Sequence, residues 1–193
     1  MFSFSSKKDL LSQWRAYGQY SIEFDKQLLE KQIGKIDPCI YEKNDKIDYA
    51  KKRIYKVFES IEKEINTGNN LFSVDELIKI VSDLACFKHN NFKEENEYRR
   101  ISQAGSHYTY SSESKMKYCN KKKYRVKGAM LVPYIEVKIS IDCIKSIMVG
   151  PIKNQELAYS SLLEFVNEAI LRNDSLNDYE LPILRSETPY REF

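Results

Sequence analysis

The sequence predicts an α+β fold in a single domain, residues 1–193, with a mixed or antiparallel sheet and several amphipathic helices. Three observations lead to this prediction. Stretches with strand character and stretches with helical periodicity follow one another without a steady β-α alternation. The length of 193 residues is that of one ordinary domain. The composition, 42% hydrophobic and 31% charged, is typical of globular proteins rather than of disordered or membrane proteins.

The N-terminal part of the chain predicts a strand, a helix and a second strand. The first strand is the short aromatic segment FSFS, and the second is QYSIEF. Between them a helix is expected over residues 7–17, with Trp14 and nearby leucines at helical spacing and Gly18 directly after it as a stop signal. This helix carries the chain's single tryptophan.

Two amphipathic helices are expected in the middle of the chain. The stronger one spans residues 46–67, where apolar residues recur every three or four positions from Ile47 to Ile65. The other begins at Ser73, where Glu76 completes the pattern of a capping box. Both helices are interpreted as scaffold.

Strand character returns in the second half of the sequence. The predicted strands are EYRRIS, KYRVKGAMLVPYIEVKIS and IKSIMVG. Between the first two lies a polar segment, QAGSHYTYSSESKMKYCNKKK, with the composition of a loop. A last amphipathic helix is expected over residues 154–171, and the closing segment YELPILRSETPYREF is expected to contain a strand and a tail.

The charge balance limits the kinds of partner that the whole molecule can attract. The net charge of +3 arises from 31 basic and 28 acidic residues, so an electrostatic partner has to be recognised by a local patch. No stretch approaches the ~20 apolar residues that a membrane-spanning helix needs. The N-terminus also lacks the basic-then-apolar order of a signal peptide. We therefore expect a cytoplasmic protein that does not use a membrane.

The cysteines indicate core positions rather than a metal site. They are four in number, widely spaced and never arranged as C-x-x-C, and they lie in or beside apolar runs. With two histidines in the whole sequence, a zinc site would need ligands from distant segments. We interpret Cys39, Cys86, Cys119 and Cys143 as small core residues and expect no metal.

Three small polar clusters are candidates for a functional site, because each follows or enters a predicted strand. The first holds Ser3 and Ser5 with Trp14 and Arg15, the second Glu95 and Glu97 with Arg99, and the third Ser186 with Tyr190 and Arg191. None of them is a catalytic motif by spacing alone.

The alternation of a strand gives the second cluster two interpretations. It sends Glu95, Glu97 and Arg99 to one face. There Glu97 forms either an ion pair at a strand edge or a carboxylate in a cleft that orients a nucleophile or steadies a cationic transition state.

Ser3 and Ser5 share one side of the first strand, with Phe4 on the other. No Gly-x-Ser-x-Gly turn surrounds either serine, which argues against a serine hydrolase. Arg15 is either a ligand-binding side chain or part of a buried structural pair, since both roles use a planar forked donor.

A basic run with interleaved tyrosines, KMKYCNKKKYR, is the local patch that suggests contact with a phosphate backbone. It includes Lys121, Lys122, Lys123 and Arg125. Such runs are more often solvated loops, so nucleic-acid binding is the weakest of the functional hypotheses.

Several blocks of the sequence together resemble a bacterial domain-of-unknown-function family, number 2971, which is often labelled as an abortive-phage-resistance protein. The blocks are SFSSKKDLLSQWRAYG, YSIEFD, CIYE, FKHNNFKEENEYRRI, GAMLVPYIEV, IKSIMVGP and ILRSETPYR, in this order. The resemblance covers nearly the whole chain. It implies an antiphage-defence context and a shorter member of the family, without the N-terminal segment that normally precedes the Ser-Phe-Ser block.

Two short segments, Ser3-Phe4-Ser5 and Glu95-Asn96-Glu97, are similar to motifs of ADP-ribosyltransferases of the arginine-serine-glutamate type. Those enzymes have a first-strand arginine or histidine, then Ser-x-Ser, then a late Glu-x-Glu. This similarity implies that Ser3 or Ser5 helps to hold NAD, that Glu97 orients the ribose and stabilises the oxocarbenium-like centre, and that Glu95 positions the acceptor. No residue upstream of Ser3 matches the first-strand position, so the implied site is incomplete.

An alternative function is a sensing or interaction module without catalysis. Arginine forks recognise phosphate and carboxylate groups. In this alternative, arginines from distant segments converge on an anionic ligand or a protein partner. The residues are Arg15, Arg99, Arg125 and Arg191.

Overall fold

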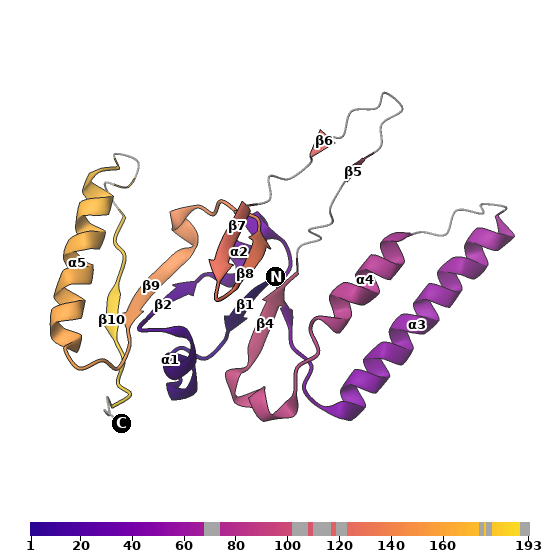
Figure 1. Ribbon diagram of the computed structural model, residues 1–193, viewed down its shortest axis with the longest axis horizontal. Helices are drawn as coiled ribbons and strands as arrows, with labels where there is room; N and C mark the ends of the chain where they lie inside the picture. The colour runs from indigo at the N-terminus through magenta and orange to yellow at the C-terminus, as the bar shows by residue number, and fades with distance from the viewer. Residues whose placement is uncertain are drawn as a thin grey trace. The chain divides into compact units, whose positions relative to one another are not determined.

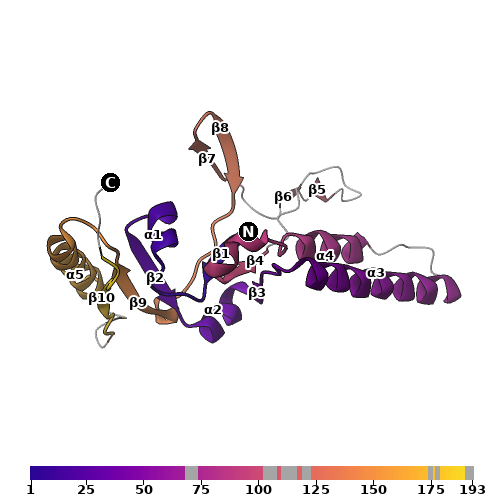
Figure 2. The same cartoon turned by 90° about the horizontal axis from the view of Figure 1, so that it is seen from below.

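The computed structural model describes residues 1–67, 74–101, 108–109, 117–118, 123–173, 176 and 179–189. The chain divides into a larger unit, residues 2–48, 86–100 and 139–193, and a smaller unit, Met1 with residues 49–85 and 101–138. Figures 1 and 2 label the elements of both units. Helices together with antiparallel and mixed sheets confirm the predicted α+β class. The assignment of residues 1–193 to one domain stays a prediction.

Among the described residues, the larger unit contains two three-stranded sheets, three helices that lie wholly within it, and two short turns of 3-10 helix. In chain order its elements are β1 (Phe2–Ser5), α1 (Leu11–Tyr17), β2 (Tyr20–Phe24), α2 (Lys26–Ile33), β3 (Asp37–Pro38), η1 (Asn90–Glu95), β4 (Glu97–Arg100), η2 (Ile141–Cys143), β9 (Ile144–Val149), α5 (Gln155–Leu171) and β10 (Ile183–Arg185). Of the helices, α3 (Lys43–Asn66) begins in this unit and continues in the other.

The first sheet has the order β1-β4-β3 and is antiparallel throughout. It covers a small core of Leu29, Ile36 and Cys143, against which the half-buried rings of Phe4 and Tyr98 pack. These two rings come from paired positions of β1 and β4 and so share one face of the sheet. The opposite face carries Ser3, Ser5, Glu97 and Arg99. Glu95 was predicted on the same strand face, but this was wrong, because the residue ends η1 and β4 begins only at Glu97.

The second sheet has the order β10-β9-β2, with β10 parallel and β2 antiparallel to β9. Helix α5 covers one face of it, as both views show (Figures 1 and 2). Val149, Val166 and Ile183 form the core between the helix and the strands. Since side chains alternate along β9, Ser146 and Met148 face away from α5.

The smaller unit is built from helices and hairpins. Helices α3 and α4 (Val74–Leu84) lie side by side in both views, and Arg53 pairs with Asp83 at 2.7 Å between them. The strand pairs are β5 (Tyr108–Thr109) with β6 (Lys117–Tyr118) and β7 (Lys123–Lys127) with β8 (Met130–Tyr134). In α3, Val57 is buried whereas Phe58 is exposed, so the described residues cover the apolar stripe only in part.

Several features of the fold differ from the prediction or were absent from it. Among them, the short strands β5 and β6 lie in the polar segment that was expected to be a loop. The segment expected to be one long strand is the hairpin β7-β8, which turns at Gly128, a residue with a positive φ of 58° that suits glycine. Helix α2 was not expected; Asp25 caps it by accepting a hydrogen bond of 3.0 Å from the backbone N–H of Leu28. The expected helix over 7–17 begins only at Leu11.

The remaining predicted elements are present near their expected positions. They include α3, α5, β9 and a strand in the closing segment, now β10. The predicted start of a helix at Ser73 lies outside the described residues, as do Cys119 and most of the polar segment before β7. In the part of the chain that the structure describes, no helix is both long and apolar enough to cross a membrane.

Candidate functional site

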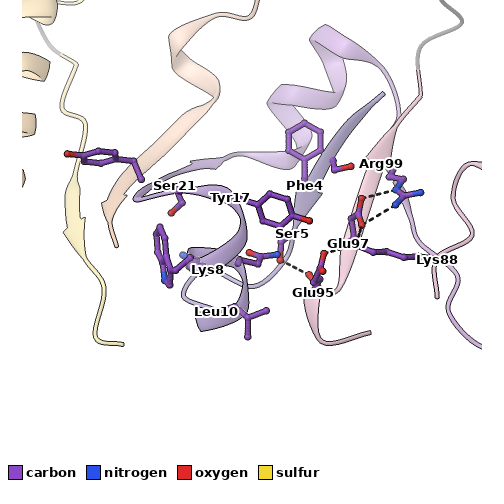
Figure 3. Close-up of a pocket in the computed structure, with 15 residues that line it drawn as sticks. Phe4, Ser5, Lys8, Leu10, Tyr17, Ser21, Lys88, Glu95, Glu97 and Arg99 are labelled. Atoms are coloured by element: carbon purple, nitrogen blue, oxygen red, sulfur yellow. Dashed lines mark hydrogen bonds and ion pairs between the residues drawn. The ribbon is translucent and has the colours of Figure 1, made fainter. Parts of the chain in front are cut away.

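The strongest candidate for a functional site is a cavity of about 450 Å³ in the larger unit. It is shown in Figure 3. Strand β1 and the start of β4 form one wall, helix α1 forms another, and the beginning of β2 closes a third side. The cavity therefore gathers segments that are separated by about ninety positions in the sequence. We call it the glutamate pocket.

The pairing of β1 with β4 brings the predicted serines and carboxylates together. Ser3 lies opposite Arg99 and Ser5 lies opposite Glu97 in the antiparallel register. All four side chains share the face of the sheet that points away from Phe4 and Tyr98. The register thus confirms that Ser3 and Ser5 share one side of their strand and that Glu97 and Arg99 share one side of theirs.

Glu97 is a buried residue of the pocket, with 6% of its surface exposed. Its Oε1 accepts a hydrogen bond of 2.7 Å from Arg99 Nε, and its Oε2 accepts one from Lys88 Nζ. Ser3 also donates a hydrogen bond to this carboxylate. In the view of Figure 3, Tyr17 and Ser5 lie on one side of Glu97, and Lys88 and Arg99 lie on the other.

These contacts keep Glu97 ionised. Burial opposes the charged form, but the hydrogen bonds from Arg99, Lys88 and Ser3 outweigh it and lower the pKa of Glu97 from 4.5 to about 2. A carboxylate with so low a pKa does not act as a proton donor at neutral pH. It can accept hydrogen bonds from a ligand or stabilise a positive charge that develops beside it.

Lys88 is a site residue that the sequence analysis missed. Its ammonium group bridges the two carboxylates, bonding Glu97 and, at 2.6 Å, Oε2 of Glu95. Burial lowers the pKa of Lys88, but hydrogen bonds to Glu95 and Glu97 raise it above its ordinary value overall, so the group stays charged. The one signal in the sequence is the acidic run Glu94–Glu97, which needs a cation once it is partly buried.

A hydrogen bond fixes the turn before β4 against β1. Ser5 Oγ donates to the backbone oxygen of Glu95 at 2.7 Å, and the backbone N–H of Lys7 donates to the same Oγ at 2.9 Å. On the far side of β4, the backbone N–H of Glu97 donates to the hydroxyl of the buried Tyr41 at 2.7 Å. Glu97 is thus held through its backbone as well as through its side chain.

Helix α1 supplies the aromatic wall of the pocket, with Trp14 and Tyr17 among the lining residues. The carboxylate of Asp9 positions Trp14 by accepting a hydrogen bond of 2.6 Å from the indole Nε1. The same carboxylate accepts hydrogen bonds from Ser186 Oγ at 2.6 Å and Thr188 Oγ1 at 3.0 Å. We call this group of bonds the Asp9 clasp, because it ties the segment after β10 to the helix that walls the pocket.

Comparison with known proteins gives one match. Residues 13–100 match the sequence profile of the family described as protein of unknown function (DUF2971). The match supports the DUF2971 family. No curated protein and no solved structure matches the chain.

The DUF2971 match covers only part of the glutamate pocket. It includes Trp14, Lys88, Glu95, Glu97 and Arg99, which form the aromatic wall and the charged group. The two serines of β1 precede the matched residues. The family match therefore contains every charged residue that lines the pocket except Lys8.

The predicted site residues fall into three groups. Ser3, Ser5, Glu95, Glu97 and Arg99 all line the glutamate pocket, although their ligand-binding and catalytic roles stay predictions.

The second group lies in the larger unit outside the lining. Arg15 is on α1 but does not line the pocket, and the buried Ser186 belongs to the Asp9 clasp. The third group has no described position in the larger unit. Arg125 is on β7 in the smaller unit, and Tyr190 and Arg191 lie outside the described residues. Of the predicted arginine cluster, the structure brings one member, Arg99, to the pocket.

For the predicted basic run, the structure describes residues 117–118 and 123–125.

Three cysteines are buried and reduced, as the sequence predicted for core positions: Cys39, Cys86 and Cys143. Burial raises the pKa of Cys39 and of Cys143, so these thiols stay protonated at neutral pH. Among the described residues, no three histidine, cysteine or acidic side chains are grouped so that they could hold a metal ion.

Proposed function

We propose that the glutamate pocket binds NAD as a substrate and that the chain handles it in the manner of an ADP-ribosyltransferase. The observation that carries this proposal is the meeting of Ser3 and Ser5 with Glu95 and Glu97 in one cavity. A Ser-x-Ser strand beside a Glu-x-Glu segment is the arrangement implied by the similarity described above. The volume of about 450 Å³ lies within the range of small-molecule sites.

The reaction would break the bond between ribose C1′ and the nicotinamide nitrogen. The bonding electron pair leaves with nicotinamide, and the ribose carries the positive charge of an oxocarbenium-like centre. An acceptor oxygen or nitrogen then forms the new bond to C1′ and loses its proton to solvent. Glu97, ionised and nearly buried, supplies a fixed negative charge for that centre. Glu95 lies beside it, where it would orient the acceptor.

The ion pairs of Glu97 still allow a substrate to bind this carboxylate. Lys88 bridges Glu95 and Glu97, so it keeps one carboxylate partner when a ribose hydroxyl takes its place on Glu97. Arg99 and Ser3 would remain and hold the carboxylate in position. Trp14 and Tyr17 line the same cavity and offer aromatic faces to the nicotinamide ring.

A second candidate is a binding module without catalysis that recognises an anionic ligand. It is favoured by the cations that line the glutamate pocket, Lys8, Lys88 and Arg99. Of these, Lys8 is 63% exposed and reaches solvent. This candidate predicts that an anion binds and that NAD is not consumed. It uses Arg99 of the four predicted arginines together with these two lysines.

The defence context belongs to the same proposal. An enzyme that consumes NAD or modifies a host target would arrest an infected cell, which fits the abortive-infection label carried by the resemblance. We expect expression in a bacterial host to slow growth, and Glu97→Gln to relieve that effect.

The experiment that tests the proposed function measures nicotinamide release from NAD by chromatography. The wild-type chain should release nicotinamide at a reduced rate, because no residue matches the first-strand position of the similar enzymes. Glu97→Gln should lower that rate further, by a factor of about 10² or more, the usual effect of removing a group that stabilises transition-state charge. Glu164→Gln, at an exposed position of α5, is the matched control and should keep the wild-type rate.

Because Glu97→Gln leaves two cations with a weaker partner, circular dichroism should first show that the variant is folded. The more conservative Glu97→Asp keeps the charge but shortens the reach, and should also lose activity. A folded wild-type chain that releases no nicotinamide, with or without acceptor, would contradict the proposed function and favour the binding module.

A further inference from the structure

We propose that the glutamate pocket is one half of a two-chamber cleft that takes a dinucleotide lengthwise. The adenine end lies in an apolar second chamber, and the pyrophosphate lies at Lys8, where the chambers meet. This inference rests on the proposed function and deepens it, since it assigns each part of the substrate to named residues. It adds a binding site and a phosphate-recognising residue that neither the family match nor the predicted catalytic group contains.

A second cavity of about 600 Å³ adjoins the glutamate pocket within the larger unit. The two cavities share six lining residues, namely Ser3, Phe4, Ser5, Lys8, Gln13 and Ser21. Both cavities therefore lie along β1 and the start of β2. These two strands are edge strands of their sheets, so one side of each backbone is open to a ligand.

The second chamber has a different chemical character because it adds apolar residues to the six that both cavities share. Its walls include Phe24, Leu29 and Tyr98, which belong to the core of the first sheet or pack against it. From the second sheet it receives the side opposite α5, where Ser21 faces Met148 in the register. An apolar chamber with aromatic walls suits a flat ring such as adenine.

The polar group of the second chamber sits on the same sheet face. Glu23 lies opposite Ser146, and Ser146 Oγ donates a hydrogen bond of 2.9 Å to Glu23 Oε2. Hydrogen bonds from Lys8 and Ser146 outweigh burial and hold the pKa of Glu23 below its ordinary value. A carboxylate that stays ionised beside the chamber is a suitable acceptor for an amino group such as that of adenine.

Lys8 is the cation that both chambers share. Its Nζ lies 2.8 Å from Glu23 Oε1, yet 63% of the side chain is exposed, so the ammonium group can turn without leaving a buried charge. Glu23 keeps Ser146 as a partner when Lys8 turns away. An exposed ammonium on a flexible stem is a typical partner of a phosphate group. Its place between the chambers matches the place of the pyrophosphate between the two halves of NAD.

The assignment fixes the direction of the substrate. Glu97 lines the glutamate pocket and not the second chamber, so the nicotinamide riboside half must lie there for the bond at C1′ to reach the carboxylate. Met148 lines the second chamber and not the glutamate pocket. The two ends can therefore be tested separately by substitution.

The test compares the affinities of the full chain for NAD and for nicotinamide riboside by isothermal titration calorimetry. The riboside lacks both the pyrophosphate and adenosine, so it probes the glutamate pocket alone. Met148→Trp fills the second chamber, and Leu171→Trp, at an exposed position of α5 that lines neither cavity, is its control. Lys8→Met removes the proposed phosphate contact, and Lys31→Met, at an exposed position on α2 that lines neither cavity, is its control.

We expect Met148→Trp and Lys8→Met each to weaken NAD binding by a factor of about ten or more, as loss of one good contact would do. Both should leave the riboside affinity within about twofold. Both controls should behave as wild type, and thermal unfolding should show that every variant is folded.

Two results would overturn the inference alone: unchanged NAD binding by folded Met148→Trp and Lys8→Met, or equal losses for NAD and the riboside. In either case NAD still binds, and Glu97→Gln still weakens it, so the proposed function stands. A wild-type chain that binds neither NAD nor the riboside would overturn both the proposed function and this inference.

Discussion

Ser5 and Glu95 lie ninety positions apart in the sequence, and Ser5 Oγ donates a hydrogen bond of 2.7 Å to the backbone oxygen of Glu95. The bond joins the first strand of the chain to the turn that leads into β4. It therefore sets the position of β1 relative to both carboxylates of the glutamate pocket.

Removing this bond should loosen the pocket without unfolding the chain. Ser5→Ala deletes a partly buried hydroxyl that also accepts from the backbone N–H of Lys7. We expect the free energy of unfolding to fall by about 1 kcal/mol, the usual net worth of such bonds. Urea denaturation measures the change. Ser160→Ala, at an exposed helical position, should cost less, and equal losses for both variants would contradict the role of Ser5.

The Asp9 clasp should contribute more to the free energy of unfolding than the Ser5 hydrogen bond does, because one carboxylate satisfies several donors. Trp14, Ser186 and Thr188 donate to Oδ1 of Asp9, and the backbone N–H of Glu187 donates to Oδ2. Asp9→Asn keeps one acceptor oxygen and turns the other into an NH₂ donor, so the bonds on both sides cannot be kept. We expect a loss of about 1–3 kcal/mol in urea denaturation. Since Trp14 is the single tryptophan, its fluorescence maximum should shift in the native state. Asp48→Asn, at an exposed position of α3, should change neither quantity.

The low pKa of Glu97 predicts how stability depends on pH. The pKa is lowered from 4.5 to about 2 in the folded state, so ionised Glu97 stabilises the fold above pH 4.5, and this contribution is lost as the pH falls towards 2. Its size is on the order of 2 kcal/mol. Urea midpoints measured between pH 6 and pH 3 should fall more steeply for the wild type than for Glu97→Gln. Parallel curves would show that the ion pairs do not shift this pKa.

Gly150 leaves room for the indole of Trp14. A Cβ at this position would lie 2.7 Å from Trp14 Cε3 and 3.0 Å from the backbone oxygen of Gln19. We expect Gly150→Ala to cost about 1–3 kcal/mol, as overpacking does, and to move the indole into the pocket. Trp14→Leu in the same chain should recover part of this loss. An alanine variant as stable as the wild type, with unchanged Trp14 fluorescence, would show that the contact is not restrictive.

Period-two alternation located the strands of the site correctly. It identified FSFS and EYRRIS as strands and placed Ser3 with Ser5, and Glu97 with Arg99, on shared faces. It was wrong for Glu95, which lies in η1 and not on the strand. It could not show that these two strands pair with each other, because pairing between distant segments depends on the packing of the whole unit. The register of β1 with β4 is the information that the structure adds.

The missed residues share a physical reason. Lys88 and Asp9 lie outside the strands and act through side chains whose partners are brought close only by folding. Neither position stands out by period or motif. Helix α2 was missed because it is short and lies directly between two segments with strand character, and the hairpin β7-β8 was missed because one glycine makes its turn.

The measurement that tests the central claim most directly is a titration of the chain with NAD, followed by the fluorescence of Trp14. This tryptophan lines the glutamate pocket and is the single one in the chain, so its signal reports on that cavity. We predict a saturable change in fluorescence for the wild type and for Glu164→Gln, and a weaker or absent response for Glu97→Gln. A folded wild-type chain whose Trp14 fluorescence does not respond to NAD, with no heat of binding in calorimetry, would contradict the account.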